Sequence, residues 1–228
     1  MQRRPRHCFS DGPLGLPRET RLTDNADVLD IPITLSTRLS QPISLEAGLA
    51  TIPVETTVKG MFFRRHVEGL GSDYETVSAT LDVPVKDGKY VAFRDYPQRD
   101  YARMIAATAR KRFPLLPGRE ALRQLAREDF KVFAESMIGK VIMTVAGDAR
   151  GSLMHVPDAY RAIVPGANVH AVDLNPHTVR ITFEPLMGFL EYTLGQLEGV
   201  VLAFDGSPLT TIHVIKDGGH AYEVVYRR

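Results

Sequence analysis

The chain has almost no cysteine, no long apolar run and almost no net charge. A single cysteine, Cys8, among 228 residues excludes an internal disulfide framework and a zinc site with several cysteine ligands. No apolar stretch approaches the roughly 20 residues that a membrane-spanning helix needs. With 28 basic and 27 acidic residues, the formal net charge is +1, which argues against a protein that mainly grips nucleic acid or an anionic membrane. We therefore expect a cytoplasmic protein and expect no nucleic-acid partner.

The signature motifs of common enzyme classes are missing as well. The chain has no G-x-S-x-G nucleophile elbow, no G-x-x-x-x-G-K-[ST] phosphate loop and no G-x-G-x-x-G dinucleotide fingerprint. We therefore assign no catalytic residue, no metal ligand and no cofactor-binding residue, and expect no cofactor. Enzymatic activity is the weaker hypothesis.

The first 53 residues differ from the rest in composition. They contain six prolines and several arginines, and their apolar residues show no sustained period. We predict a poorly ordered, basic arm over residues 1–53 and one α+β domain over residues 54–228. The arm is interpreted as a flexible extension, with a basic tail for acidic partners or a misassigned start codon as alternatives.

Helical periodicity marks the first half of the domain. Apolar residues recur at three- and four-residue spacing over 61–70, 99–113 and 119–136, where Pro97 and Gly118 precede the last two segments. A weaker helix is expected over 74–81 and a short strand over 90–96. The apolar pattern continues past Gly139 to 145, and because it is apolar on most sides we predict that this piece is buried.

The pattern of the last quarter of the chain predicts a β-hairpin, then a helix, then a second β-hairpin. Alternating runs at 169–174 and 178–183 flank a turn, an apolar helix is expected over 186–204, and runs at 210–216 and 221–227 flank Asp217-Gly218-Gly219. A three-residue loop pairs Val214 with Tyr222, Ile212 with Val224, and His213 with Glu223. The sequence therefore predicts an α+β fold, with a helical layer on a small antiparallel sheet and a C-terminal ββαββ unit.

We expect the core to draw on both layers. The predicted core residues are Phe130, Phe133, Ile138, Val141, Ile142, Phe183, Leu190, Leu197, Val201, Ile212 and Val224. Gly188, Gly195 and Gly199 lie close to one stripe of the predicted helix, where the lack of a Cβ lets another backbone or a ligand approach. Helix-on-sheet packing is the favoured explanation of this stripe.

Histidines supply the best candidates for chemistry, and each has a simpler explanation. The predicted register places His213 opposite Glu223, an arrangement that can orient an imidazole and raise its pKa, but also an ordinary exposed cross-strand pair. His155, His170 and His177 are close in sequence. They lack the helical spacing of a metal site, so coincidence is favoured.

Two further features carry charge or reactivity. Cys8 lies beside Arg6 and His7, which would lower a thiol pKa, although an unpaired cysteine without a role is favoured. The helix over 99–113 carries a basic set that could face an acidic partner or nucleic acid, although a solvated face is the default. The set consists of Arg99, Arg103, Arg110, Lys111 and Arg112.

Several landmarks together resemble an uncharacterised paralogous family found mainly in myxobacteria, a domain of unknown function. They are the opening Val58-Lys59-Gly60-Met61-Phe62-Phe63, Tyr96-Pro97 before a helix, the segment 127–145, Val156-Pro157-Asp158-Ala159-Tyr160-Arg161 as a turn, and the ββαββ tail. The resemblance covers roughly residues 54–228.

More distantly, the helices and the ββαββ tail look like the superfamily of haem–NO-binding, vinyl-reductase-associated and trafficking-complex domains. That resemblance implies an α+β fold with an internal apolar cavity, and a sensory or binding role. Domains of the haem-binding branch have a proximal histidine on a helix, together with a Tyr-x-Ser-x-Arg motif that binds the haem carboxylates. This chain lacks that motif, since Tyr160-Arg161 has neither the serine nor the spacing.

Three functional hypotheses follow. The first is a non-enzymatic cytoplasmic binding or signalling module that holds a small apolar ligand. The second is a protein-interaction adaptor with a filled core that acts as a homodimer, as the trafficking-complex resemblance implies. A pocket of roughly 300 Å3 or more would favour the first over the second. The third and weaker hypothesis is an enzyme that uses His213 and Glu223.

Overall fold

The computed structural model describes residues 33–135, 137–204, 211–215 and 220–225. In these residues helices dominate the first two thirds, and strands are concentrated near the C-terminal end. The helices are α1 (Leu45–Ala50), α2 (Gly60–Leu70), α3 (Tyr74–Ser78), α4 (Gln98–Arg112), α5 (Gly118–Glu135), α6 (Met137–Ala146), α7 (Ala149–Met154), α8 (Val156–Ile163) and α9 (Leu190–Leu202). The strands are β1 (Ile33–Thr34), β2 (Thr57–Lys59), β3 (Asp95–Pro97), β4 (Val169–Asn175), β5 (Thr178–Phe183), β6 (Thr211–Ile215) and β7 (His220–Val225).

The main sheet has the order β1-β6-β7-β5-β4, and all its pairings are antiparallel. Both predicted hairpins are present, and the predicted register of the second is confirmed: Ile212 pairs with Val224 and Val214 with Tyr222. Strand β7 also pairs with β5, which joins the two hairpins into one sheet. The turn at 217–219 lies outside the described residues. The α+β fold class is confirmed.

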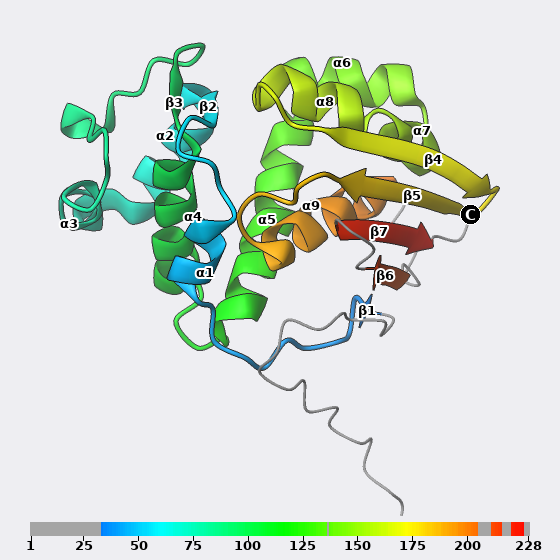
Figure 1. Ribbon diagram of the computed structural model, residues 1–228, viewed down its shortest axis with the longest axis horizontal. Coiled ribbons are helices and arrows are strands. Elements are labelled where there is room, and N and C mark those ends of the chain that lie inside the picture. The colour runs from blue at the N-terminus through cyan, green and yellow to red at the C-terminus, as the bar shows by residue number, and fades with distance from the viewer. Residues whose placement is uncertain (1–32, 136, 205–210, 216–219, 226–228) are drawn as a thin grey trace, which may run out of the picture.

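Helices α5 and α9 lie against each other beside the sheet (Figure 1). Leu194, Leu197 and Val201 of α9 belong to the same buried cluster as Ile181 and Val224 of the sheet. The opposite side of α9 meets α5. A Cβ at Gly195 would collide with the backbone carbonyl of Arg123, and one at Gly199 would lie 2.7 Å from the Cβ of Phe130. Gly195 and Gly199 therefore serve helix-on-helix packing, and the predicted helix-on-sheet explanation is wrong for them. Gly188 lies outside the helix, which begins at Leu190 and not at residue 186 as expected.

The molecule has two halves joined through α5 (Figure 1). One half contains α1 to α4 with the two-stranded sheet β2–β3, and the other contains the main sheet with α6 to α9. An aromatic group holds α2 in the first half: the Phe63 ring stacks on Tyr90 with centroids 4.4 Å apart and lies 5.6 Å from Tyr96. None of the helices in the described residues could cross a bilayer.

Part of the predicted arm belongs to the fold. Strand β1 pairs with β6, and Leu39 and Ile52 are buried. Helix α1 begins at the capping residue Ser44, whose hydroxyl accepts a hydrogen bond from the N–H of Ala47. The arm prediction is therefore corrected for residues 33–53, which supply an edge strand and apolar side chains to the core. Residues 1–32, including Cys8, lie outside the described residues.

The predicted burial of the segment after Gly139 is wrong. Val141 is 61% exposed and Val145 is 71% exposed, because α6 packs along only part of its surface. Ile142 is partly buried, and the side chain of Ile138 lies outside the described residues. The segment is nevertheless helical, and a new helix begins at Met137, just before Gly139.

Other core predictions have mixed outcomes. Burial is confirmed for five of them, which are Phe183, Leu197, Val201, Ile212 and Val224. Phe130, Phe133 and Leu190 are only partly buried. The rings of Phe130 and Phe133 pack on each other with centroids 6.0 Å apart.

Two local assignments are also corrected. The segment 156–161, interpreted as a turn, is helix α8, with Pro157 in its first turn, where the missing N–H has no effect. The strand expected over 90–96 is confined to Asp95–Pro97. Tyr90 is buried against Phe63 instead of extending that strand.

Candidate ligand cavity

A cavity of about 120 Å3 lies where the two halves of the molecule meet. One wall comes from β2, α2 and α4, and the other from α8, the ends of β4 and β5, and α9. Most of its lining is apolar, and this part consists of Ile52, Val58, Phe62, Ala102, Ile105, Ile163, Val164, Ala167, Val169, Phe183, Pro185, Leu186, Met187 and Phe189. Helical spacing explains how α4 contributes to the first wall. Four of its residues recur on one face, namely Gln98, Tyr101, Ala102 and Ile105.

Two tyrosine hydroxyls mark the polar side of the cavity. Tyr101 of α4 and Tyr192 of α9 both line it, and their oxygens are 3.0 Å apart. Tyr192 donates to Oδ2 of Asp129 at 2.8 Å, so it accepts from Tyr101. Tyr101 has then used its only hydrogen, so Nε2 of His66, 3.3 Å away, is the donor to Tyr101.

This network ends in one ion pair and one unpaired nitrogen. The Arg65 guanidinium pairs with Oδ1 of Asp129. His66 is almost fully buried, and its Nδ1 has no hydrogen-bond partner among the described residues. An imidazole with its hydrogen on Nε2 leaves a lone pair on Nδ1, so the geometry corresponds to one neutral tautomer. The network joins α2, α4, α5 and α9 behind the cavity wall.

Burial determines the charge state of this network. It lowers the pKa of His66 from 6.5 to about 4. Nearby Asp129 opposes this shift, whereas Arg65 and Arg112 add to it. Burial, followed by the charge of Asp129, raises the pKa values of Tyr101 and Tyr192 above their usual range. At neutral pH the imidazole and both phenols are therefore uncharged.

Stability should fall with acid through His66. Its pKa is lower in the folded chain than in the unfolded chain, so between about pH 6.5 and pH 4 the unfolded chain binds more protons. Between pH 7 and pH 5, the free energy of unfolding of the wild type should drop by about 2 kcal/mol more than that of His66→Gln. Urea unfolding of both proteins at the two pH values measures this. An equal drop in both would contradict the prediction.

The sequence-based candidates do not gather at this cavity. The backbone register places His213 opposite Glu223, as predicted, but the side chain of His213 lies outside the described residues. The Glu223 carboxylate accepts a hydrogen bond from Nε of Arg180 at 3.0 Å on an exposed part of the sheet. The ion pair with Arg180 therefore gives Glu223 a partner other than His213.

The three neighbouring histidines have separate surroundings. Nδ1 of His155 lies 3.4 Å from Asp158, and Nε2 of His170 lies 4.0 Å from Glu184. The backbone N–H of His177 bonds the side chain of Asn175. Within the described part of the chain, no three potential metal-ligating side chains of histidine, cysteine, aspartate or glutamate converge.

The basic helix is largely neutralised by the chain's own acidic residues. Arg103 contacts Asp82 at 3.0 Å and also pairs with Asp100. Lys111 lies 2.9 Å from Asp73, and Arg112 pairs with Glu128. The structure thus favours the interpretation of α4 as an ordinary charged helix over a docking site for nucleic acid.

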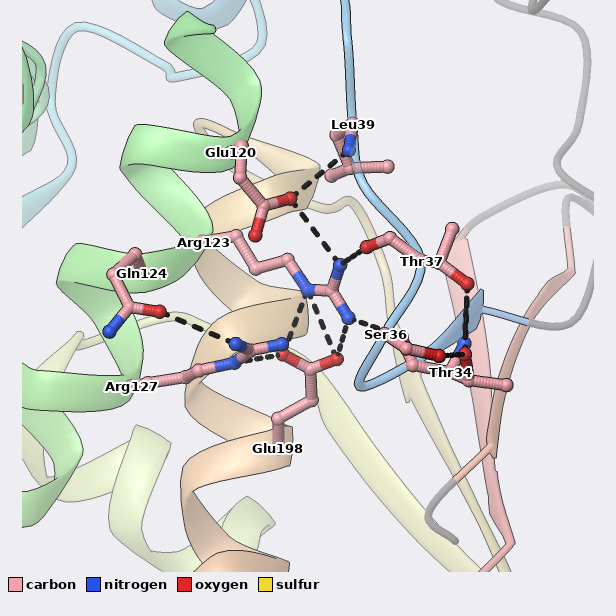
Figure 2. A network of polar contacts seen from close by, with 9 residues as sticks. All are labelled: Thr34, Ser36, Thr37, Leu39, Glu120, Arg123, Gln124, Arg127 and Glu198. Carbon is pink, nitrogen blue, oxygen red and sulfur yellow. Dashed lines mark hydrogen bonds and ion pairs between the residues drawn. The ribbon is translucent and has the colours of Figure 1, made fainter. Parts of the chain in front are cut away.

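A second buried polar cluster holds the N-terminal segment in place (Figure 2). Arg123 of α5 is fully buried and donates through Nε to Oε2 of Glu198 on α9 at 2.9 Å. Its Nη2 donates to the carbonyl of Thr34 at 2.7 Å, and its Nη1 bonds the carbonyl of Thr37. Arg127 bonds the same Glu198 carboxylate at 2.6 Å. The cluster ties β1 and the following turn to α5 and α9.

Sequence reasoning found neither cluster. The segments predicted as helices over 61–70 and 99–113 include His66 and Tyr101, but nothing in the spacing joins those helices to Asp129 and Tyr192. The available signal was the presence of polar groups within apolar stripes. Such residues need partners when buried, but the partners come from helices far away in sequence.

The sequence profile of the family described as "Protein of unknown function (DUF2378)" matches residues 52–227. The chain belongs to this family. The profile begins at Ile52 and therefore contains every element from β2 to β7 and all the residues that line the cavity. No curated protein sequence matches the chain.

The DUF2378 chain shares its fold with H-NOX proteins. The Fe(II) unliganded H-NOX protein from K. algicida matches with a TM-score of 0.54 at 12% identity, covering 75% of this chain and 96% of that one. The S. oneidensis H-NOX protein in the Fe(II)NO ligation state matches with a TM-score of 0.54 at 13% identity, covering 75% and 99%. A structure that probes heme distortion in the H-NOX family matches with a TM-score of 0.54 at 14% identity, covering 74% and 93%.

Haem does not fit the cavity of this DUF2378 chain. An apolar cavity of about 150 Å3 holds one benzene, and a macrocycle of four linked five-membered rings needs several times the 120 Å3 found here. No histidine or cysteine is among the lining residues that the structure describes. Met187 lines the cavity, but its sulfur already accepts a hydrogen bond from Thr56 at 3.8 Å.

Proposed function

We propose that this DUF2378 protein is a non-enzymatic binding or signalling module whose central cavity holds a small, mainly apolar ligand. The observation that carries the proposal is the cavity itself, which lies at the junction of two halves and is lined by residues of both. Clefts between structural halves are common ligand sites. A ligand there would contact α4 and α9 together, so its binding would favour one arrangement of the halves.

The size of the cavity restricts the ligand. At about 120 Å3 it falls below the 300 Å3 that we set as the criterion for a ligand module. By that criterion the volume counts in favour of the adaptor hypothesis, and within the ligand hypothesis it argues against a drug-sized molecule. An apolar cavity of about 150 Å3 accepts benzene or xenon, so the proposal is limited to molecules of roughly one ring or a short chain.

The second candidate function is a protein-interaction adaptor that forms a homodimer. The observation that favours it is the exposed apolar surface on α5 and α6, formed by Val132, Val141 and Val145. Helix α6 carries a single charge, on Lys140. Two copies of this surface would therefore bring few like charges together, and a second copy of the chain is the occupant that suits it.

Titration with benzene tests the ligand proposal. We expect chemical-shift changes in methyl groups of Ile105, Ile163 and Met187, which line the cavity. Ala102→Leu places three more heavy atoms in the cavity and should weaken benzene binding by at least about tenfold. Ala107→Leu is the matched control, because Ala107 lies on the same helix outside the cavity lining and should leave binding unchanged.

Two results would contradict the ligand proposal. One is the absence of any shift change in the wild-type protein at the solubility limit of benzene. The other is equal binding by wild type and Ala102→Leu, which would place benzene elsewhere.

Sedimentation of the wild type and of Val145→Glu tests the adaptor hypothesis. That hypothesis predicts that the wild type is a dimer and that the charged variant is a monomer.

A further inference from the structure

We propose that the turn between α4 and α5 docks on a lipid bilayer, with the side chains of Leu115 and Leu116 in the outer part of the acyl layer. Docking of this kind is peripheral, because only side chains of a surface segment enter the membrane interface. The turn belongs neither to the cavity nor to the exposed surface on α5 and α6, so the inference goes beyond the proposed function.

The turn presents apolar side chains that the described part of the chain does not cover. Leu115 is 95% exposed, more than any other large apolar side chain in the described residues. Leu116 is 39% exposed, and Pro114 and Pro117 on either side are exposed as well. Four consecutive apolar residues thus face solvent at one end of the α4–α5 pair (Figure 1). A run of this length on a surface points to a contact with an apolar partner.

Neighbouring segments hold the turn in place. The N–H of Arg119, just after the turn, donates to the carbonyl of Gln41 at 3.3 Å. A Cβ at Gly118 would lie 3.0 Å from the backbone nitrogen of Ile43, so the residues before α1 pack closely on the start of α5. The two proline rings fix the backbone further. Little conformational freedom is therefore lost when the turn docks.

The backbone of the turn suits an apolar environment. The N–H groups of Phe113 and Leu116 already bond carbonyls, at 3.0 and 3.1 Å. Pro114 and Pro117 have no N–H. Among the described residues, only the N–H of Leu115 lacks a partner within segment 113–117. Unpaired donors are costly in lipid, whereas a protein groove can supply acceptors for them. The small number of free donors therefore favours a bilayer over a protein partner.

Positive charge lies next to the apolar turn. The last turn of α4 contains Arg110, Lys111 and Arg112. Lys111 and Arg112 pair with Asp73 and Glu128, whereas the exposed Arg110 has no ion-pair partner in the described part of the chain. Arg110 is therefore the cation available to a lipid phosphate. A second copy of the chain would bring two basic helix ends together, which disfavours self-association here.

The near-neutral net charge of the chain is compatible with this docking. A formal charge of +1 gives little long-range attraction to an anionic membrane. Insertion of apolar side chains depends on the area removed from water and not on the total charge. The leucines should therefore supply most of the affinity, and Arg110 a smaller share.

The lack of tryptophan in the chain provides a direct test. Leu115→Trp places a single fluorophore on the turn, and tryptophan itself favours the membrane interface. Vesicles of phosphatidylcholine and phosphatidylglycerol should shift its emission to shorter wavelengths. Phe93→Trp is the matched control, because Phe93 is 75% exposed but precedes α4 at its opposite end. Its emission should stay unchanged.

Cosedimentation with the same vesicles measures the affinity without a fluorophore. Leu115→Glu should weaken the partitioning of the wild type by at least about tenfold, because a leucine is withdrawn from the acyl layer. Phe93→Glu should leave the partitioning unchanged. Both side chains are well exposed, so both variants should fold, and urea unfolding checks this.

Three results would overturn the proposal. The first is an emission of Leu115→Trp that vesicles leave unchanged, or that they shift no more than the emission of Phe93→Trp. The second is equal cosedimentation of wild type and Leu115→Glu. The third is an emission shift of Leu115→Trp that appears without vesicles as the protein concentration rises, which would assign the turn to a contact between copies of the chain.

Discussion

Arg123→Ala is expected to lower the free energy of unfolding by about 3–5 kcal/mol. The side chain is fully buried, and its removal leaves Glu198, which is 1% exposed, with Arg127 as its remaining cationic partner. The carbonyls of Thr34 and Thr37 lose a charged donor at the same time (Figure 2). A buried carboxylate left with one cationic partner in place of two, and two carbonyls that lose a charged donor, together account for the size of the effect.

A surface ion pair provides the control for Arg123. Arg161 contacts Asp158 at 2.9 Å, but both side chains are well exposed, so Arg161→Ala should change stability by less than about 1 kcal/mol. Urea unfolding followed by circular dichroism measures both variants. Hydrogen exchange should also show faster exchange at β1 in Arg123→Ala. Similar effects of the two variants would show that the buried cluster does not hold the N-terminal segment.

Gly195→Ala is expected to destabilise the fold by about 2–3 kcal/mol, although alanine is the better helix former by about 1 kcal/mol. The new Cβ would collide with the backbone carbonyl of Arg123 and lie 2.8 Å from the Cβ of Ala126. Backbone and Cβ atoms cannot move aside as the end of a flexible side chain can. Helices α5 and α9 would therefore have to separate.

Gly69→Ala is the matched comparison for this glycine. Its Cβ would lie 3.1 Å from a methyl group of Thr108 and 3.9 Å from Cδ of Arg112, both on side chains, so the stability of this variant should stay within about 1 kcal/mol of wild type. Thermal unfolding of both variants gives the comparison. A Gly195→Ala protein as stable as wild type would mean that α5 and α9 do not pack as closely as described.

Local signals were sufficient for the C-terminal hairpins. The pairing of Ile212 with Val224 could be predicted because the turn length and the alternation of apolar residues both specify the same register. Helices α2, α4 and α5 could be predicted for a similar reason, since each has apolar residues at three- and four-residue spacing with proline or glycine near its ends.

Long-range partners explain what the sequence did not reveal. Residues 33–53 have no period of their own, and their order depends on Arg123, which is about 90 residues away from Thr34. The apolar pattern of α6 predicted burial, but no described element covers Val141 and Val145. The cavity depends on how α4 meets α9, so its volume could not be predicted from spacing.

Native mass spectrometry of the protein purified from its own host, with an absorption spectrum of the same sample, tests the central claim most directly. The account predicts a mass excess that is lost on denaturation and corresponds to a molecule of roughly six to eight non-hydrogen atoms. It also predicts no Soret band. A haem spectrum would contradict the size limit of the cavity, and a chain of bare mass in a dimer would contradict the ligand-binding role in favour of the adaptor.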